Sequence, residues 1–312
     1  MLVLTKILPD YTTQARVISG LLSDKERPID TNIMLKSRLK QNNRYFSMYK
    51  LAVIGNPIAH SLSPMIWSEF ARQCEIELEY NKICAPIDDF EHVVRDFFAN
   101  GGHALSVTAP FKSRAYALAN RHNPHTLLSQ TANHLIAKDG LLLADNTDGI
   151  GLVADLRRIG RNLKNKNILI IGSGSVIYSV LSSLEAEAPR RIDLLMRDSS
   201  KLDDFIQKSR LVDAYDVAVS YDIVINTTPN VAENTLFNQV KQLSVHALAY
   251  DMIYTAKQTL FLKTMEQLNA EITQANGLGM LIQQAAAAFT LIFAKSPDID
   301  ALYPLLQEKM NG

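Results

Sequence analysis

Short apolar runs along the chain alternate with longer segments in which apolar residues recur every three or four positions. The runs LAVIG (51–55), HALSV (103–107) and ILIIG (168–172) are almost wholly apolar, which is typical of strands that are covered on both faces. Segments 63–74 and 88–100 have helical spacing instead. Strands that alternate with helices in this way predict an α/β fold with parallel sheets.

The alternation occurs twice, once up to Gly160 and again from Ile168 onward. The first series also contains a strand at 77–84, one or two helices within 111–130, a hairpin at 133–145 that turns at Asp139-Gly140, and a helix at 148–160. The second contains further strands at 192–197, 222–226 and 247–252, and helices after Gly174 and at 257–268, 278–294 and 298–310. Two such series predict two α/β domains.

The composition argues against some classes of binding partner. Lys+Arg and Asp+Glu balance at 32 each, so the chain has no excess of positive charge for nucleic acid or a membrane surface. No apolar run approaches the roughly 18–20 residues of a membrane span. The two cysteines, Cys74 and Cys84, have no metal-ligand or redox spacing and indicate a reducing compartment, so we expect a cytoplasmic protein without a metal site.

Residues 1–47 precede the first strand and carry neither a secretory apolar core nor the acid-poor composition of a transit peptide. We expect a loosely ordered extension. The alternative is that Met48 is the natural start, because MYKLAVIG leads directly into a strand.

Polar residues follow several of the predicted strands. In GNPIAHSLSP (55–64), Ser61 and Ser63 open onto a helix N-terminus, which suits a carboxylate, although Ser63 could also be only a helix cap. In SVTAPFK (106–112), Thr108 and Lys112 stand just past a strand's carboxyl end, where α/β folds carry their chemistry. Taken alone, Lys112 is more simply interpreted as a surface lysine.

Three further stretches contain candidate binding residues. ADNTDGIG (144–151) is dense in polar groups, and its Asp148 could cap a helix or bind a hydroxylated ring. INTTPN (225–230) ends a strand with threonines. NGLGMLIQQAAAAF (276–289) predicts a small-residue helix that presents Met280 and Gln284 on one face, with a buried packing helix as the alternative.

The stretch ILIIGSGSVIYSVL (168–181) has the order strand, glycine turn, helix that dinucleotide-binding folds use for a pyrophosphate. Gly172 and Gly174 match the first two glycines of G-x-G-x-x-G, but Ile177 replaces the third. Arg197 ends the following strand, where an adenosine ribose or its phosphate would be recognised.

Taken in order, these stretches resemble the quinate/shikimate dehydrogenase family. The motifs that carry the resemblance are GNPIAHSLSP, TAPFK, DNTDG, YDMIY with TLFL, and GLGMLIQQAAAAF, and they extend from about Tyr49 to the C-terminus. The resemblance implies a two-domain α/β fold. A parallel-sheet substrate domain would comprise 48–149 and 279–312, and a Rossmann-like NAD(P)-binding domain 150–278.

The resemblance also implies a reaction and its residues. The reaction is the reversible, NADP-dependent reduction of 3-dehydroshikimate to shikimate in aromatic amino-acid biosynthesis, by a monomer or homodimer. Lys112 and Asp148 would be the catalytic pair. The substrate would be bound by Ser61, Ser63, Thr108, Asn133, Asp148, Tyr254 and Gln284, and the cofactor by Gly172, Ser173, Gly174, Ser175, Arg197, Thr228, Gly277 and Met280.

Several positions depart from the family's motifs. Ser106 replaces the asparagine of N-V-T, which predicts a lost or water-bridged contact to the substrate, and His134 replaces the threonine of A-V-N-T. Ile177 at the third glycine would push its helix outward, and Asp198 beside Arg197 leans toward NAD. We therefore expect an active dehydrogenase with altered cofactor use. The alternative is a weakly active or non-catalytic relative that binds a shikimate-like or quinate-like acid.

Overall fold

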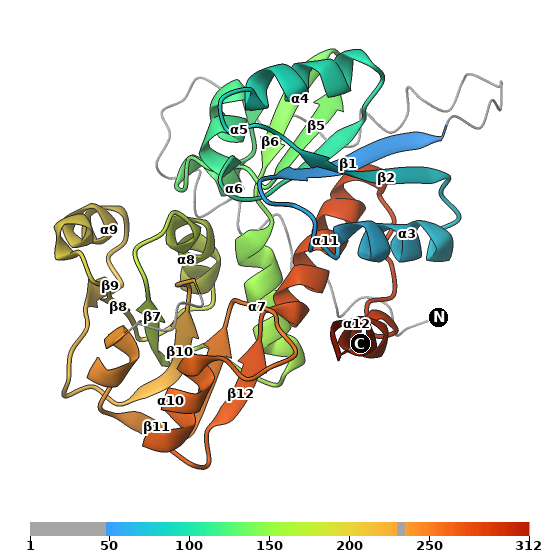
Figure 1. Ribbon diagram of the computed structural model, residues 1–312. Coiled ribbons are helices and arrows are strands. Elements are labelled where there is room, and N and C mark those ends of the chain that lie inside the picture. Colours follow the sequence, from blue (N-terminus) through green and yellow to red (C-terminus); the bar gives the residue numbers. More distant parts are fainter. Residues whose placement is uncertain (1–47, 230–234, 312) are drawn as a thin grey trace, which may run out of the picture. The chain divides into compact units, whose positions relative to one another are not determined.

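The computed structural model describes residues 48–229 and 235–311, of which Tyr49 onward belong to one compact unit. The predictions made for residues 1–47 lie outside the described residues. Within these, two six-stranded sheets are formed (Figure 1). No helix among them is long and apolar enough to cross a membrane.

The first sheet has the strand order β2-β1-β3-β5-β6-β4. Its strands are β1 (Tyr49–Gly55), β2 (Leu78–Cys84), β3 (Ala104–Val107), β4 (Arg121–His122), β5 (His134–Lys138) and β6 (Leu141–Asp145). β1 runs parallel to β2 and β3, whereas β5 is antiparallel to both β3 and β6. The predicted hairpin is therefore confirmed, and its turn residues Asp139 and Gly140 both have positive φ, as a tight two-residue hairpin requires.

Both faces of this sheet are buried, which explains the apolar run at 51–55. Leu51 and Val53 pack in one core with α3 (Ser63–Gln73), and Ala52 and Ile54 pack in another with α4 (Phe90–Ala99) and α5 (Lys112–Leu118). Figure 1 shows α4 and α5 on the opposite side of the sheet from α3. The short helix α6 (Pro124–Leu127) precedes the hairpin. The segment 111–130 thus holds two helices and the short strand β4.

The second sheet is parallel throughout, with the order β12-β11-β10-β7-β8-β9. Its strands are β7 (Asn167–Ile171), β8 (Arg191–Leu195), β9 (Val212–Ala214), β10 (Tyr221–Asn226), β11 (Leu243–Asp251) and β12 (Thr273–Asn276). Renumbered from β7, this order is the 3-2-1-4-5-6 of a dinucleotide-binding fold, which reverses between β7 and β10. The short strands β9 and β12 were not predicted.

Helices cover this sheet on both sides. Ile168 and Ile170 pack with α7 (Asp148–Arg158) and α8 (Val176–Ala186), while Leu169 and Ile171 face α10 (Leu260–Leu268). The remaining helices of this part are α9 (Leu202–Lys208) and the 3₁₀ helices η1 (Ser199–Lys201) and η2 (Thr235–Gln239).

The last two helices return to the first sheet. α11 (Leu278–Phe293) and α12 (Leu302–Asn311) contribute Ile282, Phe289 and Leu306 to the core that also holds Leu51 and Trp67. The second sheet is thus inserted between elements that share one core.

Two glycines in α7 allow helices α8 and α11 to pack closely against it. A Cβ on Gly151 would lie 2.6 Å from Cβ of Gln284 in α11, and a Cβ on Gly149 would lie 2.5 Å from the carbonyl oxygen of Ser179 in α8. Since no side chain other than hydrogen fits at these distances, Gly149 and Gly151 set how closely α8 and α11 approach α7.

Candidate active site

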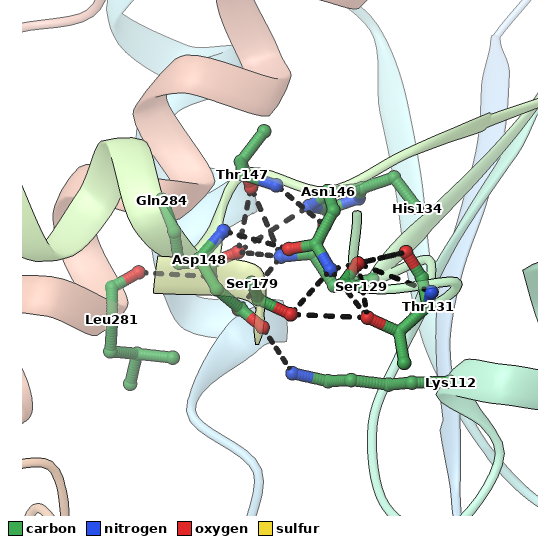
Figure 2. A network of polar contacts seen from close by, with 11 residues as sticks. Lys112, Ser129, Thr131, His134, Asn146, Thr147, Asp148, Ser179, Leu281 and Gln284 are labelled. Carbon is green, nitrogen blue, oxygen red and sulfur yellow. Dashed lines mark hydrogen bonds and ion pairs between the residues drawn. The ribbon is translucent and has the colours of Figure 1, made fainter. Parts of the chain in front are cut away.

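Lys112 and Asp148 form an ion pair between the first turns of α5 and α7. Lys112 Nζ donates to Asp148 Oδ2 at 2.6 Å (Figure 2). The carboxylate is 8 % exposed and the lysine side chain 25 % exposed, so the pair is largely shielded from water. Lys112 is therefore more than a surface lysine.

Asp148 is held on its other side by two asparagines. Asn133 Nδ2 donates to Asp148 Oδ1 at 2.9 Å, and the Asp148 backbone N–H donates to Asn146 Oδ1 at 3.1 Å. The residue that precedes helix α7 is Thr147, so Asp148 lies in the first turn and is not the cap. Its carboxylate is thus available to orient Lys112.

Gln284 reaches the same group from α11. Its Oε1 accepts from Asn133 Nδ2 at 3.2 Å and from Thr147 Oγ1 at 3.3 Å, and its Nε2 donates to the carbonyl oxygen of Leu281 at 3.0 Å. The predicted residues Lys112, Asn133, Asp148 and Gln284 are therefore brought together, although Gln284 follows the others by more than a hundred positions.

A second polar cluster joins this loop to α8. Asn146 Nδ2 donates to Thr131 Oγ1 at 2.9 Å and to Ser179 Oγ at 3.0 Å, and Thr131 Oγ1 also donates to Ser129 Oγ at 2.8 Å (Figure 2). All four residues are buried. The helix that follows the glycine turn is thus tied directly to the loop that carries Asp148.

Ser61 and Ser63 lie at the start of α3. The helix begins at Ser63 and is preceded by Leu62, so the interpretation of Ser63 as a capping side chain is wrong. The interaction runs the other way, because the Ser63 backbone N–H donates to Ser61 Oγ at 3.3 Å. Pro64 in the next position supplies no N–H, so this helix end has one backbone donor fewer.

Two other predicted substrate residues lie in different surroundings. Thr108 follows β3 directly, and its methyl group would be 2.4 Å from a Cβ on Gly55, which explains the glycine at the end of β1. Tyr254 packs against the core that holds α3 and α11, and burial raises the pKa of its phenol.

The glycine turn lies at the reversal point of the second sheet. Gly172 has φ +137°, and a Cβ there would lie 2.2 Å from Thr227 Oγ1 after β10. A Cβ on Gly174 would have nothing within 4 Å, so the backbone between β7 and α8 is open to a ligand. Ser173 is half-buried and Ser175 is exposed. Open backbone at a helix N-terminus suits a pyrophosphate.

Ile177 is completely buried in the core between β7 and α8, together with Ile168, Ile170 and Val180. The position of the third glycine is therefore filled by side-chain packing. That this isoleucine pushes α8 outward stays a prediction.

The other predicted cofactor residues are distributed around the second sheet. Arg197 is exposed and stands two residues beyond the end of β8 rather than on the strand. Thr228 Oγ1 donates to Asn226 Oδ1 at 2.7 Å, and Gly277 precedes α11. Met280 is buried in the core of the second sheet.

Asp198 Oδ1 accepts from the backbone N–H of Ser200 at 3.0 Å and caps η1. Its hydrogen bonds with Ser200 lower its pKa. Among the described residues, no group of three His, Cys, Asp or Glu side chains could hold a metal ion.

Sequence reasoning missed one part of the site, the side chains of Tyr80, Ser106 and His134. Ser106 and His134 were noted only as departures from the family's motifs, yet they are paired across β3 and β5. Ser106 Oγ lies 3.4 Å from His134 Nδ1, and His134 Nε2 lies 3.4 Å from Gln284 Oε1. Two departures that coincide on neighbouring strands were the available signal.

His134 is 1 % exposed, and its burial lowers the pKa of the imidazole to about 4. Asp145 and Asp148 oppose this shift, while the Lys112 ammonium adds to it. The imidazole is therefore neutral at physiological pH, and only one of its nitrogens carries a hydrogen.

Comparison with known proteins bears on this arrangement. Residues 53–135 match the model of the shikimate dehydrogenase substrate binding domain. A protein of Herminiimonas arsenicoxydans named shikimate dehydrogenase (NADP(+)) is 39% identical over 269 residues, which cover 84% of this chain and 98% of that protein. The chain belongs to the shikimate dehydrogenase family. Its two-sheet α/β fold is the fold of solved shikimate dehydrogenases.

Two solved structures are examples of proteins with a fold similar to that of this chain. The Ael1 enzyme from Pseudomonas putida has a TM-score of 0.76 and 32% identity, over 84% of this chain and 98% of that one. A shikimate dehydrogenase solved in complex with NADP+ has a TM-score of 0.74 and 25% identity, over 84% of this chain and 96% of that one.

Proposed function

We propose that the protein catalyses the reversible reduction of 3-dehydroshikimate to shikimate with NADP(H), in the biosynthesis of aromatic amino acids. The observation that carries the proposal is the shielded ion pair between Lys112 Nζ and Asp148 Oδ2 at 2.6 Å. Its relatives' names support the reaction and the cofactor.

The ion pair suits the chemistry of a ketone. When bound, the reduced nicotinamide supplies a hydride, and negative charge develops on the ketone oxygen. The Lys112 ammonium stabilises that charge and donates a proton to the oxygen. Asp148, fixed by Asn133 and Asn146, holds the ammonium in place.

The remaining groups would bind the rest of the substrate. Ser61 and Ser63, with Tyr254, would bind the carboxylate, and Thr108, Asn133 and Gln284 would bind the ring hydroxyls. In this proposal 48–149 and 279–312 form the substrate domain and 150–278 the cofactor domain. The substrate is a small molecule and the protein a cytoplasmic monomer or homodimer.

The cofactor side fits NADP. The open turn at Gly174 and the N-terminus of α8 would take the pyrophosphate. The Asp198 carboxylate is already used to cap η1, whereas the neighbouring Arg197 is exposed and can pair with a 2′-phosphate. These two side chains favour NADP over NAD.

The test is turnover of 3-dehydroshikimate, followed by the absorbance of NADPH and, in parallel, of NADH. We expect Lys112→Ala to lower the rate on the order of 10²–10⁴-fold, the range for a positioned acid–base group. Lys138→Ala, which removes an exposed lysine at the end of β5, is the matched control and should leave the rate unchanged.

Absence of turnover with either cofactor at high concentrations would refute the proposal. Calorimetric binding of shikimate in that case would point to the alternative, a non-catalytic binder of such acids. The assembled pair of Lys112 and Asp148 argues against it, because a carboxylate beside the ammonium hinders simple capture of an anion.

A further inference from the structure

A partly buried chain of hydrogen bonds leads from β2 to Gln284 through residues that have no assigned role. Tyr80 Oη contacts Ser106 Oγ at 2.7 Å, Ser106 Oγ contacts His134 Nδ1 at 3.4 Å, and His134 Nε2 contacts Gln284 Oε1 at 3.4 Å. Trp67 stacks on Tyr80 and also packs against His134, and these two side chains are buried, whereas Ser106 is half-buried. Tyr80, Ser106 and His134 are called the Tyr80 chain below.

One backbone N–H group fixes the direction of every hydrogen bond in the Tyr80 chain. The N–H of Thr147 donates to Asn133 Oδ1 at 2.9 Å, so the other end of that side chain is its NH₂ group. This NH₂ group contacts Gln284 at 3.2 Å, and the Gln284 atom there must accept. Because Gln284 Nε2 donates to the carbonyl of Leu281, the accepting atom is Oε1.

The assignment continues outward from Gln284. Since Oε1 accepts, His134 Nε2 carries the hydrogen and donates to it. A neutral imidazole has a single N–H, so His134 Nδ1 accepts, and Ser106 must donate to it. The Ser106 oxygen is then free to accept from Tyr80, which agrees with the donor direction of that hydrogen bond.

Three donor groups, from Asn133, Thr147 and His134, thereby face Gln284 Oε1, and the Asn133 NH₂ group also donates to Thr147 Oγ1 at 3.1 Å. Its Nε2 uses one hydrogen on Leu281, and among the described residues the other hydrogen has no protein acceptor. A flip of this side chain would set an NH₂ group against three donors, so the amide has one orientation. Gln284 accordingly offers an N–H, and not an oxygen, to whatever binds beside it.

We propose that His134 is a positioning residue that acts through Gln284, fixing its amide so that the remaining N–H donates to a hydroxyl oxygen of the substrate. The inference rests on the proposed function. Ser106 and His134 are then a matched pair across β3 and β5: the serine supplies the hydrogen that the histidine's Nδ1 accepts.

The first test is a double-mutant cycle on KM. His134→Leu removes the donor to Gln284, and we expect it to raise KM for shikimate about fivefold to tenfold, the value of one hydrogen bond. The kcat and the KM for NADP should stay within twofold, because the contact is equal in ground state and transition state. In a Gln284→Ala background the same change should have no effect on KM.

Two variants serve as controls. His134→Gln keeps an N–H donor and should restore most of the lost affinity, and His92→Leu, which alters an exposed histidine of α4, should change nothing. An equal effect of His134→Leu with and without Gln284 would overturn the proposal, as would a loss confined to kcat.

The second test needs neither substrate nor a variant. ¹⁵N NMR of the histidines distinguishes an N–H nitrogen from an accepting one, and we expect His134 to carry its hydrogen on Nε2 at neutral pH. A hydrogen on Nδ1 would overturn the proposal even in an active enzyme. If the wild-type protein turns over no shikimate with either cofactor, the proposed function fails and this inference fails with it.

Discussion

The buried imidazole of His134 makes a prediction about stability that can be worked out in magnitude. Burial lowers its pKa from 6.5 to about 4. Between these two values the folded state binds fewer protons than the unfolded state, so the contribution of His134 to stability is complete above pH 6.5 and is lost as the pH falls toward 4. One pKa unit corresponds to ~1.4 kcal/mol, so the loss at pH 5 is about 2 kcal/mol.

The pH profile of the wild-type protein alone would hide this loss. Burial raises the pKa of the Glu185 carboxyl to about 7, so the folded state binds more protons at that residue between pH 4.5 and 7. Its contribution to stability therefore increases as the pH falls over the range in which that of His134 decreases. The two trends oppose each other, and only a difference between variants separates them.

The assay is chemical unfolding of the wild-type protein and of His134→Gln at a series of pH values from 7 to 5. We expect the free energy of unfolding of the wild type, minus that of the variant, to decrease by about 2 kcal/mol over this range. The same difference taken for His92→Gln should be constant, because His92 is exposed. A constant difference for His134→Gln would refute the reasoning, since it would mean that the folded protein accepts the proton.

Three further changes test other parts of the structure. Gly151→Ala would place a Cβ 2.6 Å from Gln284, and we expect a loss of about 1–3 kcal/mol in unfolding experiments and a higher KM for shikimate. Ser179→Ala removes the buried acceptor of Asn146, at a cost of about 1–3 kcal/mol by the same measurement, and an unchanged stability would contradict that role. Arg197→Ala should raise KM for NADPH roughly tenfold and leave KM for NADH unchanged, and an equal effect on both would count against a contact with the 2′-phosphate.

Much of the fold follows from local pattern. The run at 168–172 was expected as a strand from its apolar residues, and the hairpin from Asp139-Gly140, because burial on both faces and a two-residue turn each leave a local signature. The strands β9 and β12 were missed since they have only three and four residues and are held by neighbours across the sheet. The capping role of Ser63 was wrong because Ser63 is already the first residue of the helix, which is preceded by Leu62 and has no side-chain cap.

Part of the candidate site could likewise be predicted from the sequence, and part could not. Lys112, Asp148 and Gln284 could be named from their motifs, since each stands at a strand end or on a helix face that the pattern already located. The link between Ser106 and His134 could not, because it depends on the antiparallel register of β3 and β5. Sequence alone therefore determined the α/β class and predicted the residues that we propose to react, since the signals of both are local. Only the tertiary structure decided the direction of the hydrogen bonds that orient Gln284. The donors and acceptors of these bonds come from segments that are distant in the sequence, and only folding brings them within about 3 Å of one another.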